Sequence, residues 1–276
     1  MNQFENNSYM KTALVTGPTG ILLSLDEVKD HLRVDHDESD PLIQSFIMAA
    51  TTQIENITNR KLLTQTWKAY ADAWPSEFFT LPYGNLQSVT AVNYTDEDGV
   101  QVAVTASEYI VDIVSDPGRV VLGEDEQWPN DDLYPSNPIE IEFTCGYGDH
   151  TAQTITAASN ASPIVITIAD HGYSNADRVL ISDVTGNTSA NGTWTITKLD
   201  AATFSLGASS GNAVYISGGT AVKIEVPEPI RITAMVMVGD WYANRESMFI
   251  GPNFQYVEIP NYIITMLQPY RLFNRS

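Results

Sequence analysis

The chain has 276 residues, of which 43% are hydrophobic, so it is long enough and apolar enough for one large or two ordinary folded domains. Fourteen Lys and Arg stand against 34 Asp and Glu, and the net charge of -20 argues against a surface that grips DNA or RNA phosphates. Cys145 is the single cysteine, which excludes an internal disulfide.

Residues 1–20 begin with a polar stretch and end with several Gly and Pro residues, and we expect them to form an N-terminal arm. No stretch is long and apolar enough to span a membrane, and the first residues lack the charged-then-apolar pattern of a signal peptide. We therefore expect no membrane association. The protein should be made and kept in a cytosol, or packaged into a particle that is assembled there.

Two helices follow the arm. Ser24 and Glu27 have the spacing of a capping box, which predicts a short helix over 25–32. Asp40 and Pro41 then suit the start of a long helix over 40–60. Its apolar residues recur every three or four positions and form one stripe: Ile43, Phe46, Ile47, Ala50, Ile54 and Ile57.

The opposite face of this long helix is polar but carries only one charge, which is unusual in so acidic a chain. We predict that it meets a neighbouring subunit through neutral groups, with Gln44, Thr51 and Gln53 as interface residues. The alternative is an ordinary solvated face, because exposed residues are mostly polar.

From residue 62 the pattern changes to strands, which are separated by turn signals such as Asp96-Glu97-Asp98-Gly99. We expect a compact antiparallel β unit of about six strands. The expected strands cover residues 63–70, 78–81, 89–94, 100–104, 109–113, 119–122 and 139–143.

Residues 151–223 are rich in Thr, Ser, Ala, Asn and Gly and show no helical period. They predict a small, β-sandwich-like, all-β module inserted into a host domain, which would then consist of residues 21–150 and 224–276. The fold class is accordingly α+β: a helical bundle with an antiparallel β unit, plus an inserted all-β module.

The host resumes with a helix over 230–242 that is apolar on nearly all sides. We predict that another subunit covers part of it, at Met235, Val236 and Trp241. A short helix over 261–267 precedes a basic, aromatic end, and we predict that this end docks onto a partner through Tyr270, Arg271, Leu272 and Phe273. The alternative is an ordinary frayed terminus.

No catalytic motif emerges. The four histidines (His31, His36, His150 and His171) lack metal-ligand spacing, and the acidic loop that begins at Asp35 fails the EF-hand pattern. Nucleophile elbow, Walker and dinucleotide motifs are absent. We therefore expect no enzyme, no catalytic residues, no metal and no cofactor, and a structural protein.

Five segments together resemble the tailed-phage head-tail connector family, also called portal adaptors or head-completion proteins. They are LSLDEVKDHLRVDHDESD, the long helix segment Pro41–Leu63, the strand ending in CGYG, VPEPIRITAMVMVGDWYANRES and IITMLQPYR. The resemblance implies a virion protein at the head-tail junction, assembled in the host cytoplasm, in which about twelve copies form a ring. That ring joins the portal protein to a tail completion or tail terminator protein and extends the DNA channel. It also implies that the C-terminal segment contacts the portal. The net negative charge fits a channel through which DNA slides without specific binding, and from it we predict that the channel-facing surface is acidic.

The module over 151–223 departs from this family, because it interrupts a link that is usually short. Its sequence is similar to a small β repeat of phage virion proteins, and we expect an outward decoration. An alternative function is a phage surface or carbohydrate-binding protein that acts through this module. Exposure of Tyr173, Trp194 and Tyr215 on one face would favour that alternative, whereas their burial would disfavour it.

Overall fold

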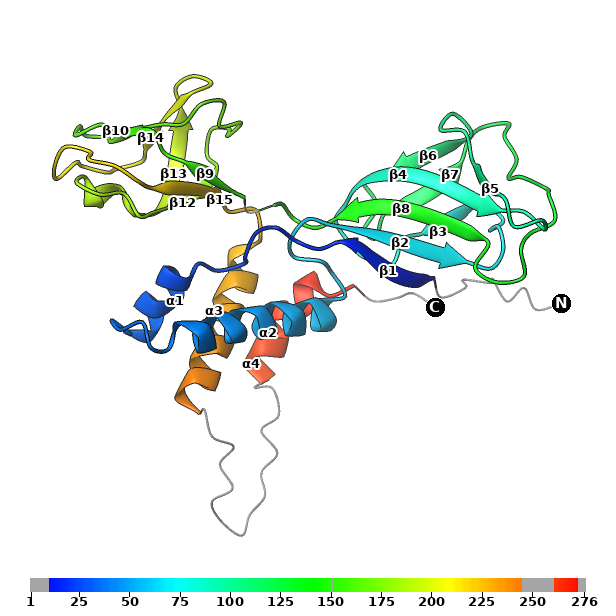
Figure 1. The fold of residues 1–276 in the computed structure, drawn as a ribbon, viewed down its shortest axis with the longest axis horizontal. Coiled ribbons are helices and arrows are strands. Elements are labelled where there is room, and N and C mark those ends of the chain that lie inside the picture. The colour runs from blue at the N-terminus through cyan, green and yellow to red at the C-terminus, as the bar shows by residue number, and fades with distance from the viewer. Residues whose placement is uncertain (1–9, 150, 245–260, 273–276) are drawn as a thin grey trace, which may run out of the picture. The chain divides into compact units, whose positions relative to one another are not determined.

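The structure, a computed structural model, describes residues 10–149, 151–244 and 261–272 and has an α+β fold (Figure 1). The chain divides into two compact units. Met1–Tyr147 and Glu228–Ser276 form the first unit, and Gly148–Pro227 forms the second. Two segments that are far apart in the sequence therefore fold together, and the residues between them form a separate unit.

The helices of the first unit are α1 (Leu25–Leu32), α2 (Asp40–Thr58), α3 (Glu228–Ala243) and α4 (Asn261–Leu267). Helices α2 and α3 pack against each other, and α1 and α4 each contact both of them. Figure 1 shows α1 and α4 on either side of α3. Helix α2 ends two residues before the predicted limit, because Asn59 adopts a left-handed conformation with φ of 55°.

Arg231 connects α3 to the start of the chain. Its side chain is only 2% exposed, and it donates to the Leu22 carbonyl at 2.8 Å and to Glu27 Oε1 at 2.5 Å. Ser24 Oγ accepts the backbone N–H of Glu27 at 3.2 Å, as the capping box predicts. In a capping box the Glu27 carboxylate would accept the backbone N–H of Ser24. Here that carboxylate instead accepts a hydrogen bond from Arg231, which lies far away in the sequence.

The β unit contains two antiparallel sheets, with strand orders β1-β2-β8-β4-β5 and β3-β7-β6. Its strands are β1 (Lys11–Thr16), β2 (Gln65–Ala71), β3 (Phe78–Thr80), β4 (Leu86–Thr95), β5 (Gln101–Ala103), β6 (Tyr109–Asp112), β7 (Arg119–Leu122) and β8 (Ile139–Cys145).

Strand β1 lies in the segment that we expected to be an arm, and it pairs antiparallel with β2. Leu14 and Val15 on this edge strand are 52% and 46% exposed, so β1 lacks the one-sided burial that would make it recognisable in a sequence.

The CGYG segment ends strand β8 and packs against the residues that lead into β2. Cys145 is the last residue of β8 and is fully buried. Gly146 has φ of 132°, and a Cβ placed on it would lie 2.4 Å from the Leu63 carbonyl oxygen. Only glycine fits this position, because the chain there approaches the entry to β2 too closely for a side chain. Tyr147 N–H then donates to the Leu62 carbonyl at 3.2 Å.

The second unit is all β among its described residues, apart from one short 3-10 turn at Thr188–Ala190. Its strands form one continuous antiparallel order, β10-β11-β14-β13-β12-β15-β9, where we expected a sandwich-like module. They are β9 (Ala152–Thr154), β10 (Ala157–Ala158), β11 (Val165–Thr167), β12 (Arg178–Ser182), β13 (Gly192–Lys198), β14 (Thr203–Leu206) and β15 (Thr220–Lys223).

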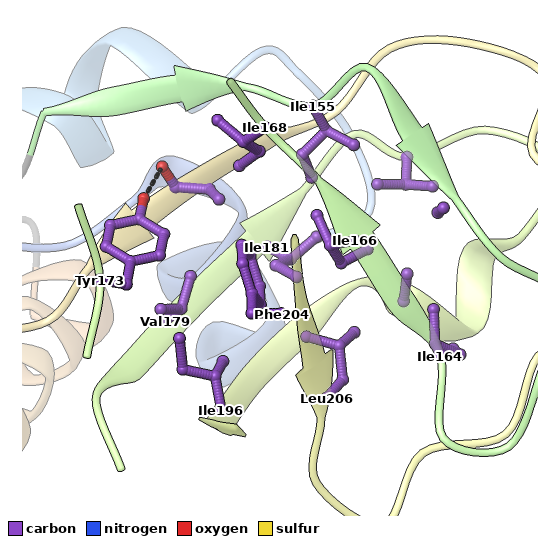
Figure 2. Close-up of a cluster of buried hydrophobic side chains, with 14 residues drawn as sticks. Ile155, Ile164, Ile166, Ile168, Tyr173, Val179, Ile181, Ile196, Phe204 and Leu206 are labelled. Carbon is purple, nitrogen blue, oxygen red and sulfur yellow. Dashed lines mark hydrogen bonds between the residues drawn. The ribbon is translucent and has the colours of Figure 1, made fainter. Parts of the chain in front are cut away.

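This unit has its own hydrophobic core, which Figure 2 shows in close-up. Ile164, Ile166, Val179, Phe204 and Leu206 have no exposed surface at all. Burial of apolar surface on this scale stabilises a small domain by about 25 cal/mol for each Å² removed from water.

Candidate functional site

The first candidate surface is the outer face of α2. Gln44, predicted as an interface residue, is exposed on this face. Thr51 and Gln53 are half-buried at its margins, and the Thr51 hydroxyl donates to the Ile47 carbonyl at 2.8 Å. The most exposed apolar side chain here is Met48, at 63%. Met48 lies outside the apolar stripe that identifies the core face, so the sequence pattern does not single it out.

The predicted interface residues on α3 lie differently. Met235 and Val236 are half-buried. The Trp241 ring packs edge-on against Phe46 of α2, with ring centroids 5.9 Å apart, so it already contacts its own chain. Ile232, which is not among the predicted interface residues, is the large apolar side chain of α3 that is exposed, at 42%.

The C-terminal segment is held against the end of α2. The Tyr270 carbonyl accepts a 2.5 Å hydrogen bond from Arg60 Nε, and the Leu272 N–H donates to the Thr58 carbonyl at 2.9 Å. The Arg271 side chain is exposed. Phe273, the fourth predicted docking residue, lies outside the described residues. The backbone of this segment is thus fixed, while its basic side chain faces outward.

Arg60 makes this attachment. It is 8% exposed, donates to Asn85 Oδ1 at 3.0 Å and forms an ion pair with Asp116. A Cβ on Gly84 would lie 2.6 Å from the Arg60 guanidinium, so the turn must pass close to it. Arg60 therefore joins the end of α2, two loops of the β unit and the C-terminal segment. No local sequence pattern predicts this role of Arg60, because its hydrogen-bond partners are 25, 56 and 210 residues away in the chain.

The β unit carries most of the net negative charge of the chain. Residues 62–147 contain fifteen Asp and Glu but only two basic residues, Lys68 and Arg119. Lys68 Nζ pairs with Glu140 at 2.9 Å, and this contact raises the pKa of the lysine. Ser115 and Arg119 bond to the Asp112 carboxylate and hold its pKa well below the usual range. Such a surface repels phosphates at moderate distance.

The potentially reactive groups have structural partners. Burial raises the pKa of the Cys145 thiol to about 12, which keeps it protonated. His171 is 2% exposed, and its Nδ1 accepts the backbone N–H of Tyr173 at 2.9 Å. His150 lies outside the described residues. Within the described ranges, no group of three or more His, Cys, Asp and Glu could hold a metal ion, and no helix is long and apolar enough to cross a membrane.

The aromatic residues of the second unit belong to its core. Tyr173 is 3% exposed and its hydroxyl donates to the Ala221 carbonyl, the bond drawn in Figure 2. Trp194 and Tyr215 are partly buried against the same core. Trp194 Nε1 donates to the Ala190 carbonyl at 2.8 Å, and the Tyr215 hydroxyl donates to the Gly218 carbonyl at 2.9 Å. This burial disfavours a carbohydrate site built on these rings.

Residues 23–115 match the model of a family described as "Phage gp6-like head-tail connector protein". The resemblance predicted from the sequence is confirmed over these residues. The match contains α1, α2 and strands β2 to β6. The curated proteins include no match.

Solved structures resemble the chain over almost its whole length. A chain in the neck of an empty GTA particle, computed with C6 symmetry, is 17% identical with a TM-score of 0.56. A chain in the virion of a native gene transfer agent particle is 16% identical with the same TM-score. A chain in the neck of the native particle, computed with C12 symmetry, is 16% identical with a TM-score of 0.54. Each alignment covers 97% of this chain and 98% of the other. At such identities the likeness shows a shared fold.

Proposed function

We propose that this chain is a structural virion protein of the head-tail connector type, which joins the capsid portal to the tail at the head-tail junction of a phage-like particle. One observation carries the proposal: residues 23–115 match the connector family, and the whole chain shares its fold with chains of gene transfer agent necks and virions. Its role is mechanical, and we propose no catalytic activity and no cofactor.

The functional form in this proposal is a ring of about twelve copies that extends the DNA channel. Two of the similar chains come from necks that were computed with C6 and C12 symmetry. Closed rings are the usual outcome when identical head-to-tail contacts repeat around an axis. The helices of the first unit form the bundle that places copies side by side.

The partners are the portal on one side and a tail completion or tail terminator protein on the other. We assign portal docking to the C-terminal segment from Tyr270 to Phe273, because Arg271 is exposed on a backbone that Arg60 and Thr58 fix. DNA passes without specific binding. The excess of carboxylates in the β unit fits an acidic passage wall, since attractive walls would slow a sliding polyanion.

The second unit is a decoration in this proposal. We propose residues 21–150 and 224–276 as the connector domain and residues 151–223 as an inserted module. Because the module has its own core, deleting it should leave a connector that still folds and joins portal rings.

Electron microscopy and native mass spectrometry of the full-length chain, alone and mixed with the portal protein of its particle, test the proposed function. We expect a ring of about twelve copies stacked coaxially on the portal. A chain that remains a single copy at every concentration, and that binds no portal ring, would overturn the proposal. A passage lined by Lys and Arg would overturn the acidic wall alone.

A further inference from the structure

Two helical faces of the first unit combine exposed apolar atoms with little charge. The first is the outer face of α2. Its core side consists of buried Ile43, Ile47, Ala50 and Ile54. The one charged residue on the outer side, Glu55, is half-buried and pairs with Lys61 at 3.2 Å. The exposed residues of this face are all neutral: Gln44, Ser45, Met48, Ala49, Thr52 and Asn56. Met48 projects from the middle of this face, between the small side chains of Ser45, Ala49 and Thr52.

The second face is on α3, and the contacts of that helix identify it. Trp241 packs on α2, Arg231 bonds to the start of α1, and the Asp240 carboxylate accepts a hydrogen bond from Tyr262 of α4. The side that remains holds Ile232, Val236 and Ala243, of which Ile232 and Ala243 are exposed. Glu228 lies one turn before Ile232 on this side, and Gly239 faces His31 and Leu32 of α1.

These two faces point in opposite directions. Helix α2 turns its buried stripe toward α3, and α3 turns Ile230, Ala234 and Trp241 toward α2. The outer stripe of each helix lies about half a turn from these contacts. The packed helix pair therefore presents one weakly charged face on each of its two sides, which we name the α2 face and the α3 face.

We propose that the α2 face of one copy binds the α3 face of the next copy. The inference rests on the proposed ring, and it specifies how that ring is built. A ring of more than two copies needs two different patches on each subunit that fit each other head to tail. Patches on opposite sides of a subunit satisfy this need, because each copy can then contact two neighbours.

Charge selects a second copy as the occupant of these faces. Each copy has a net charge of -20, so copies repel one another over most of their surface. Contact between the α2 face and the α3 face brings few carboxylates together, because Glu55 is half-buried against Lys61 and the exposed Ile232 and Ala243 are apolar. The flexible thioether of Met48 can adapt to the apolar surface around Ile232 and Ala243.

Cysteine cross-linking tests the arrangement in the full-length protein. Cys145 is the single native cysteine and is fully buried, so introduced cysteines react selectively. We expect the Met48→Cys/Ile232→Cys variant, treated with a short bis-maleimide, to give a ladder of covalent multimers up to the ring. The single variants should give almost no cross-linked product, because equivalent residues lie one subunit apart. Val114→Cys/Val214→Cys, at positions 91% and 74% exposed, is the matched control and should give no ladder.

The result that overturns the inference is a wild-type ring seen by electron microscopy in which the double variant links no better than the single ones. Dimers formed equally well by Met48→Cys alone would also overturn it, since they require two α2 faces to meet. A wild-type chain that forms no ring, even with portal protein, overturns the proposed function itself.

A mixing experiment gives a second measurement. Met48→Arg and Ile232→Arg should each fold but lose the ring, because both positions are exposed in the single chain. An equimolar mixture retains one intact α2 face and one intact α3 face, so native mass spectrometry should show heterodimers and no larger species. Rings formed by either variant alone would contradict the proposal.

Discussion

The helical part and the β unit of the first compact unit present different groups at their surfaces. Among the helices, two arginines lie inside, since Arg231 is 2% exposed and Arg60, at the end of α2, is 8% exposed. Asp26, Asp30 and Asp240 are exposed, but the outer stripes of α2 and α3 expose mainly neutral residues. In the β unit the core is apolar, with Ile139, Ile141 and Phe143 fully buried, and the carboxylates lie toward the surface. A surface with many like charges keeps copies apart, while a neutral surface with exposed apolar atoms permits association.

The largest expected effect comes from removing an inside charge. Arg231→Ala should lower the free energy of unfolding by about 3–5 kcal/mol, because it leaves Glu27 without its partner and opens a cavity. Urea denaturation of the full chain measures the change. Pairing the substitution with Glu27→Leu should recover much of the loss, since both members of the buried pair are then gone. An Arg231→Ala protein with the stability of wild type would contradict the conclusion that the buried Arg231 stabilises the helical part.

Arg60→Ala should cost about 2–4 kcal/mol, because it leaves Asp116 and the Tyr270 carbonyl without the guanidinium. The local effect should be larger than the global one. Hydrogen exchange of the Leu272 N–H, which donates to Thr58, should accelerate at least tenfold. Arg119→Ala, which removes a more exposed arginine of the β unit, should leave that exchange rate unchanged.

The third test concerns a surface charge of the β unit. Ser115 and Arg119 depress the pKa of Asp112 below its ordinary value of about 3.9. The ionised carboxylate therefore stabilises the native state fully above that value, and this stabilisation is lost as the pH falls through the lower native-state pKa. Asp112→Asn should reduce the urea midpoint at pH 7, and the difference from wild type should narrow between about pH 5 and pH 2. A constant difference across that range would contradict the assignment.

The smallest effect is expected at Met48. Because its side chain is 63% exposed, Met48→Ala should change the stability of the single chain by less than about 0.5 kcal/mol. The same substitution should weaken ring formation, which sedimentation over a concentration series measures. Val114→Ala on the β unit is the control and should alter neither quantity. A large loss of stability with Met48→Ala would show that the α2 face is an internal surface.

Local signals in the sequence were sufficient for most of the elements, with β1 as an exception. The capping residues predict the bounds of α1 as they are found, and the apolar period predicts α2 and the face that it buries. The turn at Asp96 to Gly99 lies between β4 and β5 as expected. Each of these features depends on residues a few positions apart, so no tertiary information is needed.

The candidate surfaces could not be predicted in the same way, because they depend on contacts between residues far apart in the chain, and local sequence patterns do not reveal such contacts. Periodicity shows that α3 is apolar all round, but it cannot tell which side another helix of the same chain covers. For that reason the sequence cannot show that Trp241 packs on Phe46 of its own chain, or that Met48 and Ile232 are exposed. The roles of Arg60 and Arg231 likewise depend on partners more than 200 residues away.

The position of the second unit in the chain has a consequence for synthesis on the ribosome. The buried stripe of α2 is completed by α3, and these helices are separated by about 170 residues, which take roughly 10–30 s to translate. During that interval Ile43, Ile47 and Ile54 have emerged but their covering helix has not, so the nascent chain carries an uncovered apolar helix while the later β strands form. The synthesis of α3 thus sets the time at which the apolar stripe of α2 can be covered.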